Sequence, residues 1–221
     1  MHFDLIVNKA KEKFPDIKVI YKDQSSLMKL LGYLMFFNKS FMTHYFTTLG
    51  STIYAPSRQY VESKEVSAQV TLLHELTHVY DSKKYSKILF GFLNGFPQIL
   101  ALLCLPLFFI SWKLALPLVI LFLLPLPAYF RMYFEKRGYI ISLYALYQLS
   151  FKYKYKPLLK TQADFFSKQF TGPYYYFMYP FSTVQKDLQI AVAKIEANEK
   201  PLDDKVMVFI DELLDVTKNA D

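Results

Sequence analysis

The sequence predicts a mostly helical α+β fold with a small β-hairpin or sheet and an inserted apolar helical hairpin. Apolar residues recur at helical spacing in several segments. The stretch from 41 to 56 is rich in Thr, Tyr, Phe and Ile and is broken by Gly50, which favours paired strands. Lys113 is the only charged residue between 88 and 130. The chain has 221 residues, which suits one domain or two small ones with a sizeable core.

The elements before residue 82 follow from local patterns. Pro56 ends the predicted strand pair, and residues 57 to 81 contain neither Pro nor Gly, so a long helix is expected there. Apolar residues at helical or alternating spacing predict a helix, a strand and a second helix at Phe3–Phe14, Ile17–Tyr21 and Ser26–Phe37.

The apolar block from 88 to 130 divides into two pieces, Phe96–Trp112 and Leu114–Phe130. Each piece has about the minimum length of a membrane-spanning helix. Trp and Lys at the break suit an interface, and membrane helices tolerate the prolines of the block. Four arrangements stay open: a spanning hairpin, a re-entrant hairpin, a hairpin lying in the interface, and a soluble helical pair buried against a protein partner.

The later elements are predicted from amphipathic spacing. One helical stretch runs from about 131 to 147 and two more cover Val184–Glu196 and Asp203–Val216. The chain therefore divides into 1–87 with the strands and the first long helix, 88–130 as the hairpin, and 131–221 as a helical part.

The positive charge of the chain flanks the apolar block. The net charge is +7, and basic residues stand on both sides of the block, at Lys83, Lys84, Lys87, Arg131, Lys136 and Arg137. This distribution predicts a membrane location with the flanking parts on the cytoplasmic side. An Arg-rich helix, a zinc finger and a Gly-rich phosphate loop are missing from the sequence, so we expect no nucleic-acid partner. The single Cys104 excludes a disulfide framework.

One motif carries recognisable chemistry: residues 74 to 78 read His-Glu-Leu-Thr-His. On a helix, His74 and His78 lie on one face one turn apart, so both imidazoles can bind one Zn²⁺. Glu75 projects beside that position, where it can take a proton from the attacking water and pass it to the leaving amine. The sequence therefore predicts a zinc site with Glu75 as the catalytic base.

A third protein ligand has to come from elsewhere in the chain, because catalytic zinc sites commonly use three. The apolar block contains no acid, and Glu135 is the first acid after it. A hairpin would return the chain beside the first helix, which makes Glu135 the candidate. The alternative is a surface Glu135 paired with Arg131 or Lys136. Asp81, three residues after His78, is a candidate for orienting a ligand.

This motif, followed by a glutamate on a second helix, resembles the gluzincin metallopeptidases. The hairpin between the two parts is similar to the membrane-embedded peptidases of the CAAX prenyl protease and heat-shock protease group. The resemblance implies a zincin-like fold with Zn²⁺ held by His74, His78 and Glu135. Members of that group usually have Asp at the position of Tyr139. The sequence around Glu135 resembles instead uncharacterised zincin-like proteins, some encoded by tailed phages.

Two further segments could serve a substrate. Zincins place an edge strand before the motif helix, and the resemblance suggests that a peptide pairs with Leu49, Gly50, Ser51, Thr52, Ile53 and Tyr54. His44 is a candidate transition-state donor. The aromatic loop from 170 to 181 could line a pocket or polarise an oxyanion, and the tyrosine candidates are Tyr139, Tyr174, Tyr175 and Tyr176. Structural roles remain the alternative for all of them.

The function that the sequence predicts is a membrane-associated, zinc-dependent metallopeptidase acting on a peptide or protein. Its hairpin would contact lipid or a hydrophobic protein partner. The alternative is a structural component of a larger assembly, such as a phage particle or a membrane complex, that keeps the fold and docks through the hairpin.

Overall fold

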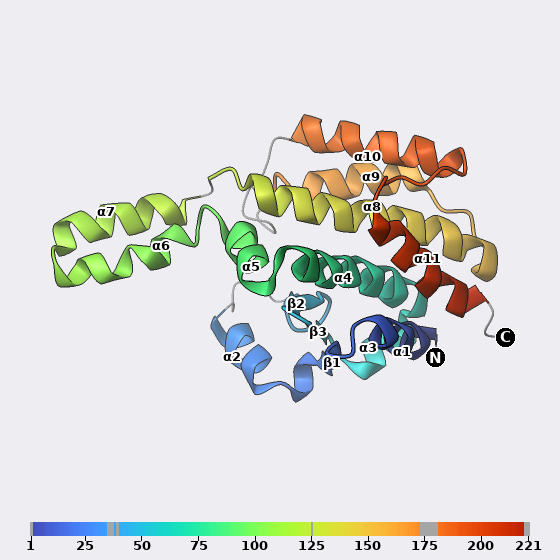
Figure 1. Cartoon of the computed structure of the whole chain (residues 1–221), viewed down its shortest axis with the longest axis horizontal. Helices are drawn as coiled ribbons and strands as arrows, with labels where there is room; N and C mark the ends of the chain where they lie inside the picture. The colour runs from blue at the N-terminus through green and yellow to red at the C-terminus, as the bar shows by residue number, and fades with distance from the viewer. Residues whose placement is uncertain (1, 35–37, 39, 125, 173–180, 219–221) are drawn as a thin grey trace.

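The structure, a computed structural model, describes residues 2–34, 38, 40–124, 126–172 and 181–218. Helices dominate this part of the chain and a small sheet accompanies them, which confirms the predicted α+β class. Two long helices, α4 (Glu65–Tyr85) and α8 (Tyr129–Tyr153), lie side by side at the centre of the molecule (Figure 1). The other helices of the body are α1 (His2–Lys13), α2 (Ser26–Leu34), α3 (Arg58–Ser63), α5 (Lys87–Gly95), α9 (Leu159–Gln169), α10 (Phe181–Glu196) and α11 (Lys205–Lys218).

The core has two main parts, one on each side of α8. The sheet, α1, α4 and α11 form the first, with Ile53, Leu73 and Phe209 fully or almost fully buried. Helices α9 and α10 cover the other side of α8 and bury Leu143 and Leu188. Since α4 and α8 contribute to the same core, side chains on their facing surfaces are held in a fixed relation.

A mixed sheet packs below α4, in the strand order β1-β3-β2. Strand β1 (Lys18–Tyr21) is parallel to β3 (Thr52–Ala55), and β2 (Thr47–Leu49) is antiparallel to it. Gly50, with φ of 62°, makes the predicted turn between β2 and β3.

One prediction about this sheet is wrong. Thr52, Ile53 and Tyr54 belong to β3, which pairs on both sides, and therefore offer no free edge to a peptide. The prediction missed the pairing of β1 with β3, which places β3 in the centre of the sheet. That pairing joins residues far apart in the sequence, so local patterns do not reveal it. The edge strands are β1 and β2; of the predicted residues only Leu49, the last of β2, lies in an edge strand, while Gly50 and Ser51 form the turn.

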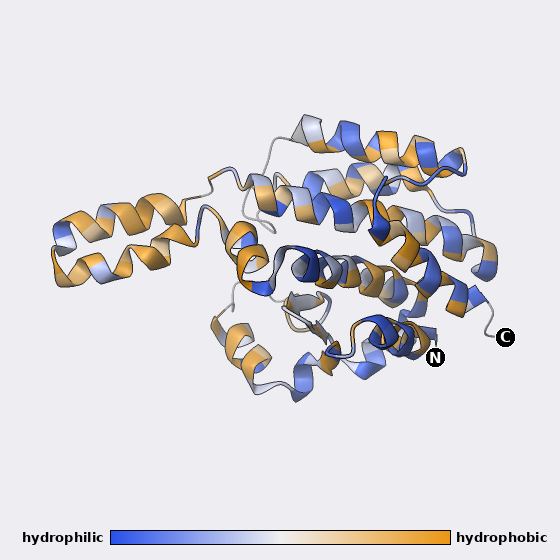
Figure 2. Cartoon of the chain, viewed as in Figure 1, coloured by the Kyte–Doolittle hydropathy of each residue, from blue (hydrophilic) through white to orange (hydrophobic). Residues whose placement is uncertain are grey.

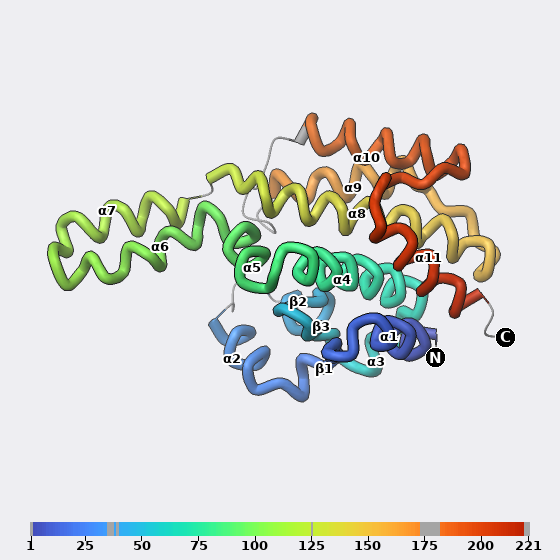
Figure 3. Tube along the Cα trace, viewed as in Figure 1, coloured from blue at the N-terminus to red at the C-terminus, as the bar shows by residue number. Residues whose placement is uncertain are grey.

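An apolar hairpin protrudes from the body between α5 and α8 (Figures 1 and 2). One arm comprises α6 (Leu100–Leu103) and the 3-10 helix η2 (Leu105–Phe109), and the other is α7 (Trp112–Leu123). The trace in Figure 3 shows the two arms lying side by side. We call residues 97–124 the protruding hairpin; its tip lies at Ile110 and Ser111, where the predicted break begins.

Among the described residues, no single helix has the length and apolarity needed to cross a membrane. One pair, Lys87–Gly95 with Leu100–Phe109, meets that test together, but it is bent by 98°.

The C-terminal half contains one helix that the sequence did not predict, α9. The predicted final helices correspond to α10 and α11. Most of the aromatic loop, including Tyr174, Tyr175 and Tyr176, lies outside the described residues, so their proposed roles stay predictions.

Candidate metal centre

His74, His78 and Glu135 come together between α4 and α8. The His74 and His78 Nε2 atoms are 3.1 Å apart. One carboxylate oxygen of Glu135 lies 3.4 Å from the first and 3.8 Å from the second. All three groups are largely buried, and their ligand atoms lie within 4.8 Å of one another. The motif helix and the helix after the hairpin thus bring together the three predicted ligands.

The spacing of these atoms suits a shared metal ion. Zinc–nitrogen bonds of about 2.0–2.1 Å in a tetrahedral site separate two ligand nitrogens by about 3.3 Å. The observed Nε2–Nε2 distance of 3.1 Å is close to this value. Two imidazoles and a carboxylate are also a donor set that catalytic zinc sites use. The three residues could therefore hold one ion and leave a coordination position open.

Ser142 orients His74 from behind. Its hydroxyl lies 3.3 Å from His74 Nδ1 and donates to the carbonyl oxygen of Gly138 at 3.1 Å. The hydroxyl proton is thereby used, so Ser142 accepts a hydrogen bond from His74 Nδ1–H. This tautomer leaves the lone pair of Nε2 directed at the other ligands.

Gly138 lets α8 approach His74 closely. A Cβ atom on residue 138 would lie 2.6 Å from two atoms of the His74 ring, a distance that real Cβ atoms essentially never show. Gly138 lies about one turn after Glu135, so one face of α8 supplies both the ligand and the space. Any side chain here would displace His74 or the helix.

The electrostatics of the site favour a positive charge. Burial by itself would lower the pKa of His78, but the carboxylates of Glu135, Glu75 and Asp81 raise it to about 9. Burial by itself would raise the pKa of Glu135, yet His78 and His74 hold it well below its usual range. A bound cation would be stabilised by the same carboxylates that stabilise the proton on His78.

Glu75 is held by the edge strand of the sheet. The hydroxyl of Thr48, in β2, donates to Glu75 Oε2 at 2.6 Å. Glu75 is 9% exposed and lines a cavity, so it does not stand in open solvent. Strand β2 therefore positions the candidate base and also forms one edge of the sheet.

A cavity of about 940 Å³ lies in front of the three candidate ligands. Its walls come from β2 and the segment before it and from α3, α4, α5, α8 and α9, and His44 is one of the lining residues. The His44 ring is exposed, and its Nδ1 lies 2.7 Å from the hydroxyl of Thr43. The structure thus places His44 in the wall of the same cavity.

Asp81 does not orient a ligand by hydrogen bonding, contrary to the prediction. It is fully buried, and its two oxygens accept two hydrogen bonds of 3.0 Å from the Arg137 guanidinium on α8. Arg137 also lies 3.1 Å from Asp204. The side chain lies between α4 and α8, where the Arg137 guanidinium takes up both of its oxygens. Asp81 therefore fixes α8 against α4.

Tyr139 packs edge-on against the candidate ligand His74. The two ring centroids are 4.9 Å apart with an interplanar angle of 77°. Phe166 and Phe170 cover Tyr139 from behind, with ring centroids 4.5 and 5.6 Å away. The ring of Tyr139 thus limits the movement of His74, while the imidazole donates its hydrogen bond to Ser142.

Sequence reasoning missed Thr48, Ser142 and the role of Gly138. A glycine inside a predicted helix, three residues after a candidate ligand, was the available signal for Gly138. Thr48 and Ser142 gave no comparable signal, because their contacts depend on how β2 and α8 pack.

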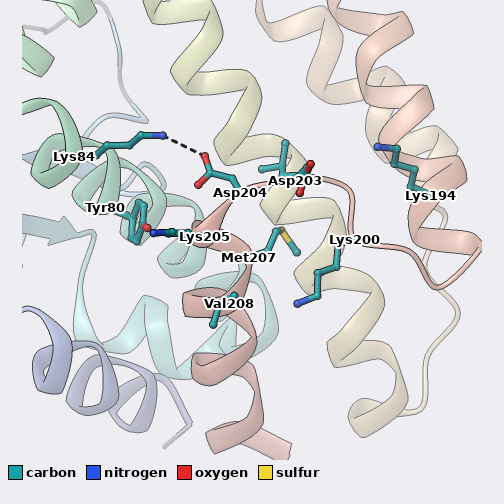
Figure 4. Close-up of a pocket in the computed structure, with 10 residues that line it drawn as sticks. Tyr80, Lys84, Lys194, Lys200, Asp203, Asp204, Lys205, Met207 and Val208 are labelled. Atoms are coloured by element: carbon teal, nitrogen blue, oxygen red, sulfur yellow. Dashed lines mark hydrogen bonds and ion pairs between the residues drawn. The ribbon is translucent and has the colours of Figure 1, made fainter.

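A second hollow, of about 1090 Å³, is lined by residues of α4, α10, α11 and the α10–α11 connection (Figure 4). Lys84 faces Asp204 there at 3.5 Å. The lining is a mixture of lysines, aspartates and apolar residues, with neither His nor Cys. We assign no chemistry to this hollow.

Comparison with known proteins adds no family assignment: no family model, curated protein or solved structure matches this chain.

Proposed function

We propose that this chain is a membrane-associated, zinc-dependent metallopeptidase of gluzincin type. The observation that carries the proposal is the convergence of His74, His78 and Glu135, with Glu75 beside them at the wall of a cavity. The donor set and its spacing support zinc over Mg²⁺ or Ca²⁺, which prefer oxygen ligands.

The residues of the chain have distinct roles in this reaction. When bound, zinc would polarise the peptide carbonyl and lower the pKa of a water molecule. Glu75 accepts a proton from the attacking water and delivers it to the leaving amine. Thr48 keeps the Glu75 carboxylate in place, and Ser142 and Tyr139 keep His74 in one orientation.

Two substitutions test the proposal. Glu75→Gln should abolish peptide hydrolysis and leave zinc bound, because it removes the proton acceptor but no ligand. Glu135→Ala should lose zinc, which metal analysis after dialysis would detect. Glu62→Gln, an exposed Glu paired with Arg58 at 2.9 Å, is the matched control and should change neither property. A fully active Glu75→Gln protein would refute the mechanism.

The second candidate function is an integral component of a larger assembly. The exposed protruding hairpin favours it, since such a surface also suits docking into a protein complex. Peptide cleavage that stops with a zinc chelator and returns with added zinc would support the peptidase. A zinc-loaded protein without cleavage of any peptide in a diverse library would support the assembly component.

A further inference from the structure

Apolar residues dominate the hairpin at one end of the molecule (Figure 2), and many of the exposed apolar side chains belong to this part of the chain. The protruding hairpin carries the largest group of them, and α2 and α5 carry further ones. On the hairpin they are Leu102, Leu103, Leu105, Phe108, Phe109, Ile110, Trp112, Leu114, Leu116, Ile120, Leu121, Leu123 and Leu124. On α2 and α5 they are Leu27, Leu30, Tyr33, Leu34, Ile88, Leu89 and Phe92.

Apart from the exposed Lys113 and the partly exposed Gln98 and Ser111, the hairpin is apolar around its surface. Small side chains, Ala101 and Ala115, are buried within it, while Phe109 and Ile110 at the tip are 95% and 81% exposed. A helix that is apolar all round is normally buried, either inside a large protein or in a membrane. A groove on a partner protein would cover only one side of the hairpin. Lipid acyl chains would cover all sides, so the exposed apolar surface favours lipid.

The length of the hairpin sets the depth it can reach. Helix α7 has 12 residues, which rise about 18 Å at 1.5 Å per residue. The hydrocarbon core of a bilayer is about 30 Å thick, so one leaflet contributes about 15 Å. The tip, with Trp112 and Lys113, would then lie near the bilayer centre. Transfer of two or three leucines offsets the cost of one lysine there, and the hairpin offers many more.

Positive charge lies at the start of α5, the helix that leads from α4 to the base of the hairpin. Lys87, the first residue of α5, shares the carboxylate of Asp16 with Lys83, at 3.1 and 2.5 Å. Two lysines therefore share one carboxylate, which leaves an excess positive charge at this point. Such a charge would be attracted to the acidic headgroups of a membrane surface.

Helix α5 connects this base to the candidate metal centre. Phe90 and Asn94 line the cavity, and the Phe90 ring centroid is 6.3 Å from that of His78. Arg131, at the start of α8, donates to the carbonyl oxygen of Asn94 at 2.9 Å. Helix α5, which would lie at the headgroup layer, thus forms part of the cavity wall.

We infer that the protruding hairpin enters one leaflet of an anionic membrane without crossing it, and that the cavity then lies at the level of the headgroups. This makes the substrate class a polypeptide segment at the membrane surface. The substrate class rests on the proposed peptidase function, but the insertion does not. Vesicle binding needs no metal, so a failed insertion and a failed catalytic proposal give different results.

The sole tryptophan of the chain, Trp112, reports the depth of the tip. The full chain is mixed with vesicles of phosphatidylcholine alone or with phosphatidylserine, and binding is measured by flotation. Trp112 fluorescence is then quenched by lipids brominated either near the headgroup or near the end of the acyl chain. We expect tighter binding to the anionic vesicles, stronger quenching by the deep bromine, and no effect of a zinc chelator on either.

Paired variants control for folding and for non-specific adhesion. Phe109→Glu should weaken vesicle binding by at least about tenfold, since a charged side chain near the bilayer centre costs more than one tenfold step. Val208→Glu places the same change on an exposed apolar residue of α11, 52% exposed, and should bind like the wild type.

Three results would overturn the inference. Stronger quenching by the shallow bromine would indicate a hairpin that crosses the bilayer or lies flat in the interface. Equal binding by the Phe109→Glu and wild-type chains would remove the hairpin as the anchor. A stable dimer that stays off both kinds of vesicle would show that a second copy covers this surface.

Discussion

Gly138 determines how closely α8 can approach the candidate metal centre. Gly138→Ala should lower zinc affinity by about tenfold or more, because His74 must turn or α8 must move. It should also destabilise the fold by about 1–3 kcal/mol, as overpacking does. Zinc titration and thermal unfolding measure the two effects.

Gly91 provides the matched control for this substitution. It lies on α5, and a Cβ there meets no atom within 4 Å. Gly91→Ala should therefore keep zinc affinity and gain up to about 1 kcal/mol, as alanine usually does in a helix. Equal zinc affinity of the Gly138→Ala and Gly91→Ala proteins would contradict the role given to Gly138.

Thr48 should affect the reaction rate more than it affects the metal. Thr48→Val removes the hydrogen bond to Glu75 and should reduce kcat by about tenfold, since a hydrogen bond to a charged group contributes about 1.5–3 kcal/mol. Zinc affinity should stay at the wild-type level. Thr52→Val, in the adjacent strand β3, is the control. A wild-type kcat for Thr48→Val would show that Glu75 needs no such support.

At the scale of elements, a buried ion pair holds α4 and α8 together. Arg137→Met leaves the carboxylate of Asp81 buried without its partner, so we expect a loss of about 3–5 kcal/mol. The double variant Asp81→Leu/Arg137→Met should recover much of that loss, because Asp204 keeps Lys84 as a partner. Urea unfolding of the single and double variants gives the coupling energy.

An exposed ion pair on α1 is the comparison for this cycle. Glu12→Gln removes the partner of Lys9 and should change stability by less than about 1 kcal/mol. If Arg137→Met were as mild as Glu12→Gln, the Asp81–Arg137 pair would not be what fixes the two helices.

Elements with a strong local pattern could be predicted from the sequence. The motif fixes His74, Glu75 and His78 within two turns of one helix, and the acid-free block left Glu135 as the nearest later carboxylate. The hydroxyl contacts of Thr48 and Ser142 could not be predicted, because they depend on packing between distant segments. The same reason explains the strand order: the parallel β1–β3 pair makes Thr52–Tyr54 central and leaves β2 at the edge.

At the scale of the whole molecule, one buried lysine should make stability depend on pH. Lys22 is fully buried; its ammonium donates to the Phe41 carbonyl oxygen at 2.7 Å and lies 3.9 Å from the centre of the Phe41 ring. Burial lowers the pKa of Lys22 to about 8 from an ordinary value of 10.5. Between these values only the unfolded chain holds the proton, so stability rises with pH.

Comparison with Lys22→Met isolates this effect. The free energy of unfolding of the wild type should rise relative to that of Lys22→Met from pH 8 to about pH 10.5, by about 3 kcal/mol. Lys29→Met, at an exposed position of α2, should show no such rise. A constant difference between wild type and Lys22→Met across this range would mean that Lys22 keeps an ordinary pKa when folded.

The position of the hairpin in the chain has a consequence for biosynthesis. A ribosome makes His74 and His78 first, then the hairpin, and Glu135 last. The nascent chain therefore exposes its most apolar segment before the third ligand exists. If the hairpin enters a membrane during translation, the candidate metal centre is completed only on a chain that is already anchored, so the proposed peptidase would become active only at the membrane.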